Sequence, residues 1–137
     1  MTRAPIDDWA AARSHKWRRQ LTGLEAMLAP IDAALIEALA LTAPARIADV
    51  GCGAGATTIE VSRVARAGSV VHGFDLSPAL IDVARSRQCP REVPVSFDVA
   101  DMESAAPPAQ PYDRLVSRLG VMFFRNPLGA FSNLRQW

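Results

Sequence analysis

The feature that most constrains the fold is a short apolar segment that runs directly into a glycine-rich turn. Residues 46–50 read RIADV, and the next five residues, GCGAG, place glycine at every second position. Glycine permits positive φ angles and a close approach of the backbone to a ligand. A helix predicted at residues 57–66 presents its free amides at the same point. This order of strand, turn and helix predicts an α/β fold with a ligand site at the turn.

The rest of the chain continues the alternation. Further strands are predicted at residues 70–75, 95–99 and 112–118. Helices are predicted from Ser77-Pro78 to about residue 87 and from residue 128 to the end, because a serine or asparagine followed by proline is typical of a helix start. Before the first strand, apolar residues recur every three or four positions over residues 21–39, which predicts an amphipathic helix bent at Pro30. This alternation of strands and helices predicts a parallel sheet with helices on both faces.

Composition excludes several other classes of protein. Half of the 137 residues are hydrophobic, and 15 basic residues balance 14 acidic ones, so neither disorder nor a general attraction to nucleic acid is expected. The basic and tryptophan-containing stretch at residues 8–20 is interpreted as a solvated helix face. No apolar run has the length of a membrane span, and the first residues lack the layout of a secretory signal. Cys52 and Cys89 do not form a metal-binding set. We therefore expect a cytoplasmic chain without a metal.

An acidic residue stands at or near the end of each of the first three predicted strands. Asp49 lies at the end of the first, Asp75 closes the second, and Asp101 follows the third. Since the carboxyl ends of parallel strands meet at one edge of a sheet, the three carboxylates are expected to surround one ligand. Asp75 can accept hydrogen bonds from both hydroxyls of a ribose, and Asp101 can accept one from the exocyclic amine of adenine. Asp49 favours a positively charged group. The pattern predicts an adenosine with a cationic extension.

Simpler interpretations of the same residues stay open. The turn also reads as G-x-G-x-x-A, a weak dinucleotide-binding motif, although Asp49 would repel a pyrophosphate. Asp49 could instead order the turn by accepting its amides. Asp75 could cap the helix that begins near Ser77 or form the turn before it, and Asp101 could be an exposed loop acid.

These segments resemble the class I S-adenosylmethionine-dependent methyltransferases, in a bacterial branch that acts on small molecules. The matching stretches are IADVGCGAGATT, VVHGFDLSPALIDVAR, SFDVADM and YDRLVSRLGVMFFRNPLGAFSNLR, within residues 15–137. The resemblance implies a Rossmann-like sheet and S-adenosyl-L-methionine as cofactor. It places Asp49 and the turn residues beside the methionine part of that cofactor. These turn residues are Gly51, Cys52, Gly53 and Gly55.

The resemblance also implies the remaining contacts. Asp75, with Leu76 beside it, would hold the ribose hydroxyls, and Asp101 with the backbone of Met102 would hold the adenine. From their position at the end of the predicted fourth strand, we expect Ser117 and Arg118 beside the methyl group of the cofactor or the acceptor. The alternative for Arg118 is a solvated or helix-capping arginine.

Methyl transfer from a sulfonium is an in-line displacement that requires no covalent enzyme intermediate, so alignment and exclusion of water are the main tasks of the protein. No general base stands out. His72 lies inside the second strand, where a structural role is predicted, and His15 lies in an N-terminal helix that could cover the site. Cys52 is expected to fill space within the turn. Phe123 and Phe124 are expected to pack in the core rather than to line an acceptor pocket.

The sequence departs from the family pattern in two places. After the fourth strand it has SRLG instead of the Asn-Pro-Pro-Tyr-like tetrapeptide of enzymes that methylate nucleic-acid amino groups, which favours a small-molecule acceptor. It also ends within the helix after the fourth strand, whereas family members continue to a seven-stranded sheet. We therefore expect an α/β fold that lacks the last strands, with a helical lid at residues 1–43 and a truncated cofactor-binding half-domain at residues 44–137.

Two other functions fit parts of the pattern. A cofactor-binding half-domain without turnover could associate with itself, or with a partner, through the exposed edge of the fourth strand. A nicotinamide-dependent oxidoreductase could use the same strand, turn and helix, although Asp49 and Asp101 argue against it. The leading prediction is a methyltransferase for a small-molecule acceptor, with no nucleic-acid or membrane partner.

Overall fold

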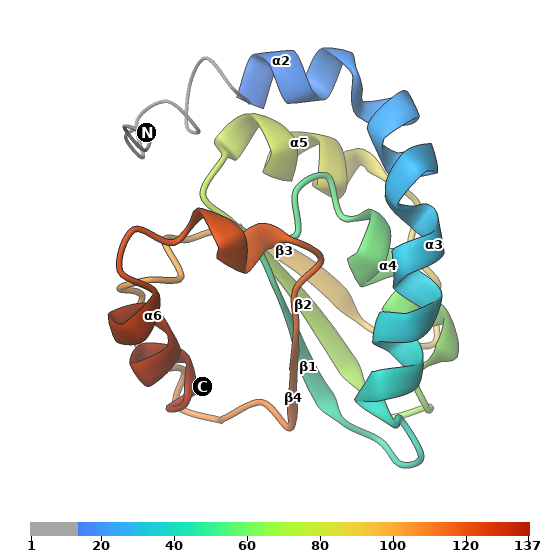
Figure 1. Ribbon diagram of the computed structural model, residues 1–137. Coiled ribbons are helices and arrows are strands. Elements are labelled where there is room, and N and C mark those ends of the chain that lie inside the picture. The colour runs from blue at the N-terminus through green and yellow to red at the C-terminus, as the bar shows by residue number, and fades with distance from the viewer. Residues whose placement is uncertain (1–13) are drawn as a thin grey trace.

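The computed structural model describes residues 14–137, which form one parallel sheet of four strands flanked by helices (Figure 1). The strand order is β3-β2-β1-β4. The strands are β1 (Arg46–Val50), β2 (Val70–Asp75), β3 (Val95–Val99) and β4 (Arg114–Val116). The helices are α2 (Ser14–Arg19), α3 (Leu21–Leu39), α4 (Ala56–Val64), α5 (Pro78–Ser86), the 3-10 helix η2 (Gly120–Phe123) and α6 (Pro127–Leu134).

The predicted α/β alternation is confirmed, and the bounds of β1, β2 and β3 are those expected from the sequence. Two helices begin where proline follows a capping residue. The Ser77 hydroxyl accepts a hydrogen bond from the Leu80 amide at the start of α5, and the Asn126 side chain accepts one from the Gly129 amide at the start of α6. Each cap satisfies an amide that the helix itself leaves unpaired. These starts fix the loops that follow β2 and precede α6.

The sheet separates two apolar layers. In Figure 1, α3 and α4 lie on one side of the sheet and α6 lies on the other. Alternate residues of β1 serve the two layers: Ile47 packs with Leu39 and Val61, whereas Val50 packs in the cluster that contains Leu134. All these side chains are at most 5% exposed. Burial on both faces is what a parallel sheet requires.

The fourth strand is shorter than the predicted 112–118. It pairs with β1 only from Arg114 to Val116, because the chain turns away immediately afterwards. Leu119 adopts a left-handed conformation with φ of 66° and begins the 3-10 helix, which the sequence analysis did not anticipate. β4 lies at the edge of the sheet, as expected. Its Val116 side chain is buried, and Leu115 is 37% exposed.

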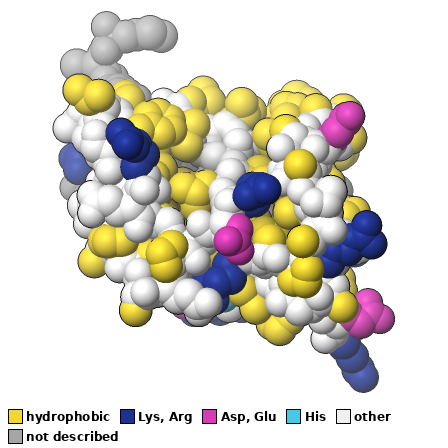
Figure 2. Space-filling model, turned by 90° about the horizontal axis from the view of Figure 1, so that it is seen from below, with side chains coloured by type: hydrophobic (Ala, Val, Ile, Leu, Met, Phe, Trp, Pro, Cys, Tyr) yellow, Lys and Arg dark blue, Asp and Glu magenta, His cyan; other side chains and the backbone are white. Residues whose placement is uncertain are grey.

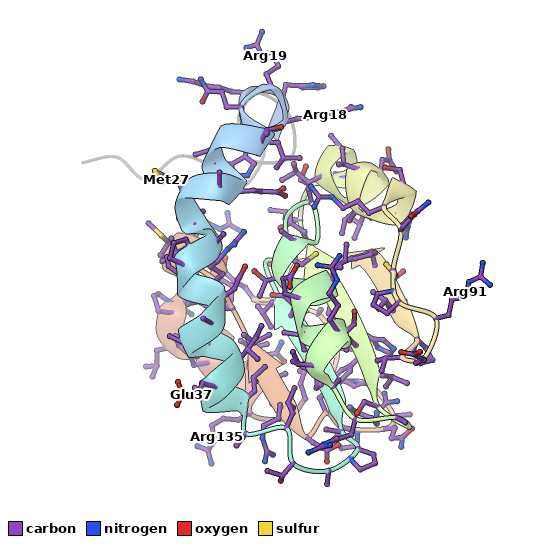
Figure 3. All side chains as sticks on the ribbon, turned by 90° about the vertical axis from the view of Figure 1, so that its right-hand side faces the viewer. Arg18, Arg19, Met27, Glu37, Arg91 and Arg135 are labelled. Atoms are coloured by element: carbon purple, nitrogen blue, oxygen red, sulfur yellow. The ribbon has the colours of Figure 1, made fainter. Side chains whose placement is uncertain are left out.

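The predicted N-terminal helix is present, but its apolar stripe is only partly buried. α3 continues through Pro30 without a break. Met27 is 66% exposed and projects away from the sheet (Figure 3), and Ile31 is 36% exposed. The buried residues of α3 are Asp32 and Leu39. The C-terminal end of α3 packs against the sheet through Leu39. A groove of about 970 Å³ is lined by residues of α3 and α4.

The division expected near residues 43–44 falls in the loop between α3 and β1, while residues 1–13 of the expected lid lie outside the described residues. None of the helices described has both the length and the apolar character of a membrane span. On the face seen in Figure 2, basic and acidic side chains are scattered among hydrophobic ones, and neither sign of charge covers the surface.

Candidate functional site

The glycine-rich turn after β1 is held by close backbone packing. Gly51 has φ of +72°, and a Cβ atom there would lie 2.8 Å from the Cα atom of Gly120 in η2. Its amide and the amide of Cys52 both donate to the Phe74 carbonyl of β2. Gly55 has φ of +84°, and a Cβ there would collide with the Phe97 ring. Only glycine meets both demands, positive φ and absence of a side chain, at these two positions.

Asp49 is the most deeply buried acid near this turn, at 1% exposure. One carboxylate oxygen, Oδ2, accepts a hydrogen bond of 2.7 Å from the Thr58 hydroxyl. The other, Oδ1, has no hydrogen-bond partner among the described residues. Burial raises the pKa of Asp49 to about 7, although the Thr58 hydrogen bond and the charge of Arg118 act in the opposite direction. An unpartnered buried acceptor is costly, so this oxygen is suited to a ligand that brings a donor or a positive charge.

Asp75 links the end of β2 to the turn. Its Oδ2 accepts the Gly53 amide at 2.8 Å and its Oδ1 accepts the Ser77 amide at 2.9 Å. Burial raises the pKa of Asp75, and the hydrogen bonds from the Ser77, Gly53 and Leu76 amides lower it. Asp75 is therefore also a turn residue, as the alternative interpretation of it predicts. A carboxylate has about four acceptor sites, so Asp75 retains capacity for further donors.

Asp101 and Met102 follow β3. Asp101 Oδ1 accepts the Glu103 amide at 3.0 Å, which shapes the turn after the strand. Asp101 is half-buried, and Met102 is 4% exposed within the core cluster on the α6 side. Both residues contact the same cavity as Asp49 and Asp75.

That cavity has a volume of about 150 Å³ and lies where β1, β2 and β3 end. Its polar floor contains Asp49, the turn from Gly51 to Ala54, Asp75, Leu76 and Asp101. Its apolar walls come from three separate parts of the chain. The first is the pair α2 and α3, the second is α5, and the third is the segment around η2. The wall residues are Trp17, Leu21, Leu24, Leu28, Leu80, Leu119, Phe123 and Phe124.

Most of the residues predicted for the site line this cavity, but Ser117 and Gly55 do not. Ser117 donates from its hydroxyl to the Val50 carbonyl at 2.6 Å and accepts the Val121 amide at 3.3 Å, so it joins the ends of β1 and β4. Gly55 lies beneath the turn against Phe97. Cys52 lines the cavity, and burial raises the pKa of its thiol. The thiol is therefore not prepared for nucleophilic attack.

Sequence reasoning missed Asp32. Its Oδ1 accepts the Thr57 hydroxyl at 2.7 Å, and its Oδ2 accepts Arg118 Nη1 at 3.0 Å. Asp32 lies four residues after Leu28 and three before Leu35, which puts an acid on the apolar stripe of α3. An acid at such a position is the signal that could have revealed a buried ion pair.

The two histidines lie outside the cavity. His72 Nδ1 shares a hydrogen bond with the Tyr112 hydroxyl, and burial lowers the pKa of the imidazole. His15 is exposed on α2. Within residues 14–137, no group of three or more His, Cys, Asp or Glu side chains is arranged to hold a metal ion.

The sequence matches known proteins over most of the sheet. A family model described as a methyltransferase domain matches residues 47–137. The chain is 41% identical over 83 residues to a magnesium-protoporphyrin O-methyltransferase of Rhodobacter capsulatus, a match that covers 60% of this chain and 35% of the relative. It is 31% identical over 88 residues to the aklanonic acid methyltransferase DauC of Streptomyces sp. strain C5, covering 64% and 40%. The chain thus spans less than half of each relative.

Solved structures share the fold. The plantazolicin methyltransferase BpumL in complex with SAH superimposes with a TM-score of 0.73 at 21% identity, covering 96% of this chain and 52% of that one. The magnesium protoporphyrin IX methyltransferase ChlM of Synechocystis PCC 6803, with bound SAH, gives a TM-score of 0.70 at 18% identity, covering 94% and 64%.

Proposed function

The chain belongs to the methyltransferase domain family, and from this premise we propose that it binds S-adenosyl-L-methionine in the cavity and transfers the methyl group to a small-molecule acceptor. The observation that carries the proposal is the buried Oδ1 atom of Asp49, which lacks a partner within the described residues. Asp49 lines a cavity that Asp75 and Asp101 also line. A cationic adenosine derivative matches this set of acceptors in charge and hydrogen bonding.

The residue roles follow from the positions of the three acids. Asp49 and the turn from Gly51 to Gly53 would face the methionine part of the cofactor, where the Asp49 carboxylate attracts positive charge. Asp75 would accept the ribose hydroxyls with its remaining acceptor sites while it keeps the Gly53 amide in place. Asp101 would accept the adenine amine, beside the backbone of Met102. We do not include Ser117 among the contacts, because its hydroxyl is used within the fold.

The chemistry requires little beyond alignment. When bound, the cofactor supplies a methyl group already activated on a sulfonium, which an acceptor atom can displace in line. The apolar walls would exclude water, and Trp17, Leu24 and Leu28 of α2 and α3, which line the cavity, would act as a lid over the bound cofactor. Exclusion of water and fixed orientation are the contributions a protein makes to such a displacement.

The acceptor is proposed to be a small molecule with an apolar body. The names of the two relatives refer to magnesium-protoporphyrin and to aklanonic acid, which are both small molecules. The wall residues Leu119 and Phe123, which line the cavity together with Arg118, offer apolar contact to such an acceptor.

A second candidate function rests on the edge of the sheet. β4 has a neighbour on one side only, and its Leu115 is 37% exposed. On α6, Phe131 is 50% and Leu128 is 81% exposed. An open strand edge beside apolar surface favours pairing with another chain. The chain would then be a cofactor-binding module that associates with itself. Sedimentation that depends on concentration, together with cofactor binding without turnover, would favour this candidate.

The proposed function is tested by calorimetric titration with S-adenosylhomocysteine. The wild-type chain is expected to bind one equivalent. Asp75→Ala removes the acceptor of the Gly53 and Ser77 amides and is expected to weaken binding at least tenfold. Asp82→Asn, which changes an exposed acid on α5, is the matched control and is expected to bind like wild type. A folded wild-type chain that produces no binding heat would refute the proposal.

A further inference from the structure

Arg118 is the one basic residue that lines the cavity among those the structure describes. It lies two residues after β4, and its side chain is 12% exposed. Its Nη1 donates to Asp32 Oδ2 at 3.0 Å, and Asp32 is itself fixed by the Thr57 hydroxyl on α4. The guanidinium is therefore held from the α3 side by a carboxylate that cannot move freely.

Much of the hydrogen-bonding capacity of Arg118 is unused. A guanidinium has five N–H donors arranged as a planar fork, and in residues 14–137 the structure gives Arg118 one hydrogen bond, the one to Asp32. None of its nitrogens is among the fully buried atoms that lack a partner. Arg118 lines both the cavity and the groove between α3 and α4. Its remaining donors therefore reach open space at the junction of the two.

The other acids of the cavity do not require Arg118 as a hydrogen-bond partner. Asp75 accepts two backbone amides, and Asp101 accepts the Glu103 amide. Glu25 pairs with Arg87 at 2.7 Å. Arg118 is thus a positive group in a cavity whose acids, apart from Asp49, already have hydrogen-bond donors or ion-pair partners of their own.

We propose that Arg118 is the receptor for a carboxylate group on the ligand of this cavity, with Asp32 holding its fork in position. The inference rests on the proposed function and adds the ligand group that the open side of the guanidinium recognises. A carboxylate matches this fork in charge and geometry and can accept two parallel hydrogen bonds. The carboxylate can belong to the amino-acid end of the cofactor or to an acidic acceptor whose apolar body lies against Leu28 and Phe123.

The test compares ligands that differ in their carboxylate, using wild type, Arg118→Met and Arg118→Lys. S-adenosylhomocysteine has the carboxylate, whereas 5′-methylthioadenosine lacks the amino-acid end. The acceptor side is tested under saturating S-adenosylhomocysteine with 1-naphthoate and the uncharged 1-naphthylmethanol. Arg87→Met is the matched control, because it removes the ion pair between Arg87 and Glu25 of α3, and Arg87 does not itself line the cavity. Circular dichroism melting confirms that each variant is folded.

If the cofactor carboxylate is recognised, Arg118→Met weakens S-adenosylhomocysteine about 10- to 100-fold and leaves 5′-methylthioadenosine unchanged. If an acceptor carboxylate is recognised, both adenosine ligands bind as before and the preference for 1-naphthoate over 1-naphthylmethanol is lost. In either case Arg118→Lys shows a smaller loss and Arg87→Met shows none.

Three results would overturn the inference. The first is equal weakening of both adenosine ligands by Arg118→Met, which would indicate a structural role. The second is a loss of the same size in Arg87→Met. The third is unchanged binding of S-adenosylhomocysteine in Arg118→Met, combined with no preference for 1-naphthoate in wild type. Absence of S-adenosylhomocysteine binding by wild type would instead refute the proposed function itself, and this inference with it.

Discussion

Replacing Asp49 by asparagine is expected to stabilise the fold while it weakens the binding of a cationic cofactor. The Asp49 carboxyl is 1% exposed, and its pKa is raised from 3.8 to about 7. In the unfolded chain the carboxyl ionises near pH 4, so the native state binds its proton more tightly than the unfolded state does. The stability of the native state therefore falls as the pH rises from about 4 to about 7 and stays low above that.

The magnitude follows from the two pKa values. Each tenfold change in the acid dissociation constant corresponds to about 1.4 kcal/mol, so a rise from 3.8 to about 7 corresponds to about 4 kcal/mol. Asparagine has the shape of aspartate without the charge. Asp49→Asn is therefore expected to increase the free energy of unfolding by up to about 4 kcal/mol at pH 8, and by roughly 1.5 kcal/mol at pH 5.

Urea denaturation at pH 5 and pH 8, followed by circular dichroism, measures this difference in wild type, in Asp49→Asn and in the exposed control Asp82→Asn. The same samples, titrated with S-adenosylmethionine, are expected to show weaker binding in Asp49→Asn only. Wild-type affinity should also fall as the pH drops below about 7, because the protonated carboxyl no longer attracts the sulfonium. Parallel pH dependence of stability in wild type and Asp49→Asn would refute the reasoning.

Other substitutions test the packing around the site. Gly51→Ala combines a positive φ with a Cβ atom 2.8 Å from a backbone Cα atom of η2, and it should lower the free energy of unfolding by about 2–5 kcal/mol. Gly53→Ala also has a positive φ but meets no atom within 4 Å, so it should lower that free energy by about 1–2 kcal/mol. Urea denaturation measures both, and equal losses would contradict the close packing at Gly51. Gly23→Ala, in open space on α3, should raise stability by about 0.5–1 kcal/mol, and a loss would show that α3 is not helical there. Thr58→Val removes the hydrogen-bond donor to the buried Asp49 carboxylate and should reduce stability at pH 8 by about 1–3 kcal/mol. Because Asp49 is protonated at pH 5, the loss of stability should be smaller there, and an equal loss at both pH values would contradict this expectation.

The sequence allowed the architecture to be predicted because its signals are local. The glycine-rich turn identified the first strand and helix, and Ser77-Pro78 and Asn126-Pro127 identified two helix starts. The three acids at the strand ends could be assigned to one edge of the sheet because parallel strands place their carboxyl ends together. All three line the same cavity.

The features that escaped prediction depend on contacts between distant segments. Asp32 and Arg118 are 86 positions apart in sequence, and nothing local to either residue reveals the other. The approach of Gly120 to Gly51 likewise depends on the register of β4 against β1. Ser117 is expected in the site because it lies at the end of the predicted fourth strand, but its hydroxyl donates to the Val50 carbonyl of the neighbouring strand instead. Strand ends identify the edge at which a site lies, whereas side-chain direction within that edge is set by tertiary packing.

Asp49, Asp75 and Asp101 are proposed to surround a single binding site for S-adenosylmethionine. Two-dimensional amide NMR of the 15N-labelled chain, titrated with S-adenosylhomocysteine, tests it most directly at a mass of 14.8 kDa. Binding at this site is expected to produce saturable shifts of the Gly53, Leu76 and Met102 amides, with no change at the opposite ends of the strands, such as Val70. Absence of shifts, or shifts confined to residues outside the cavity, would contradict it.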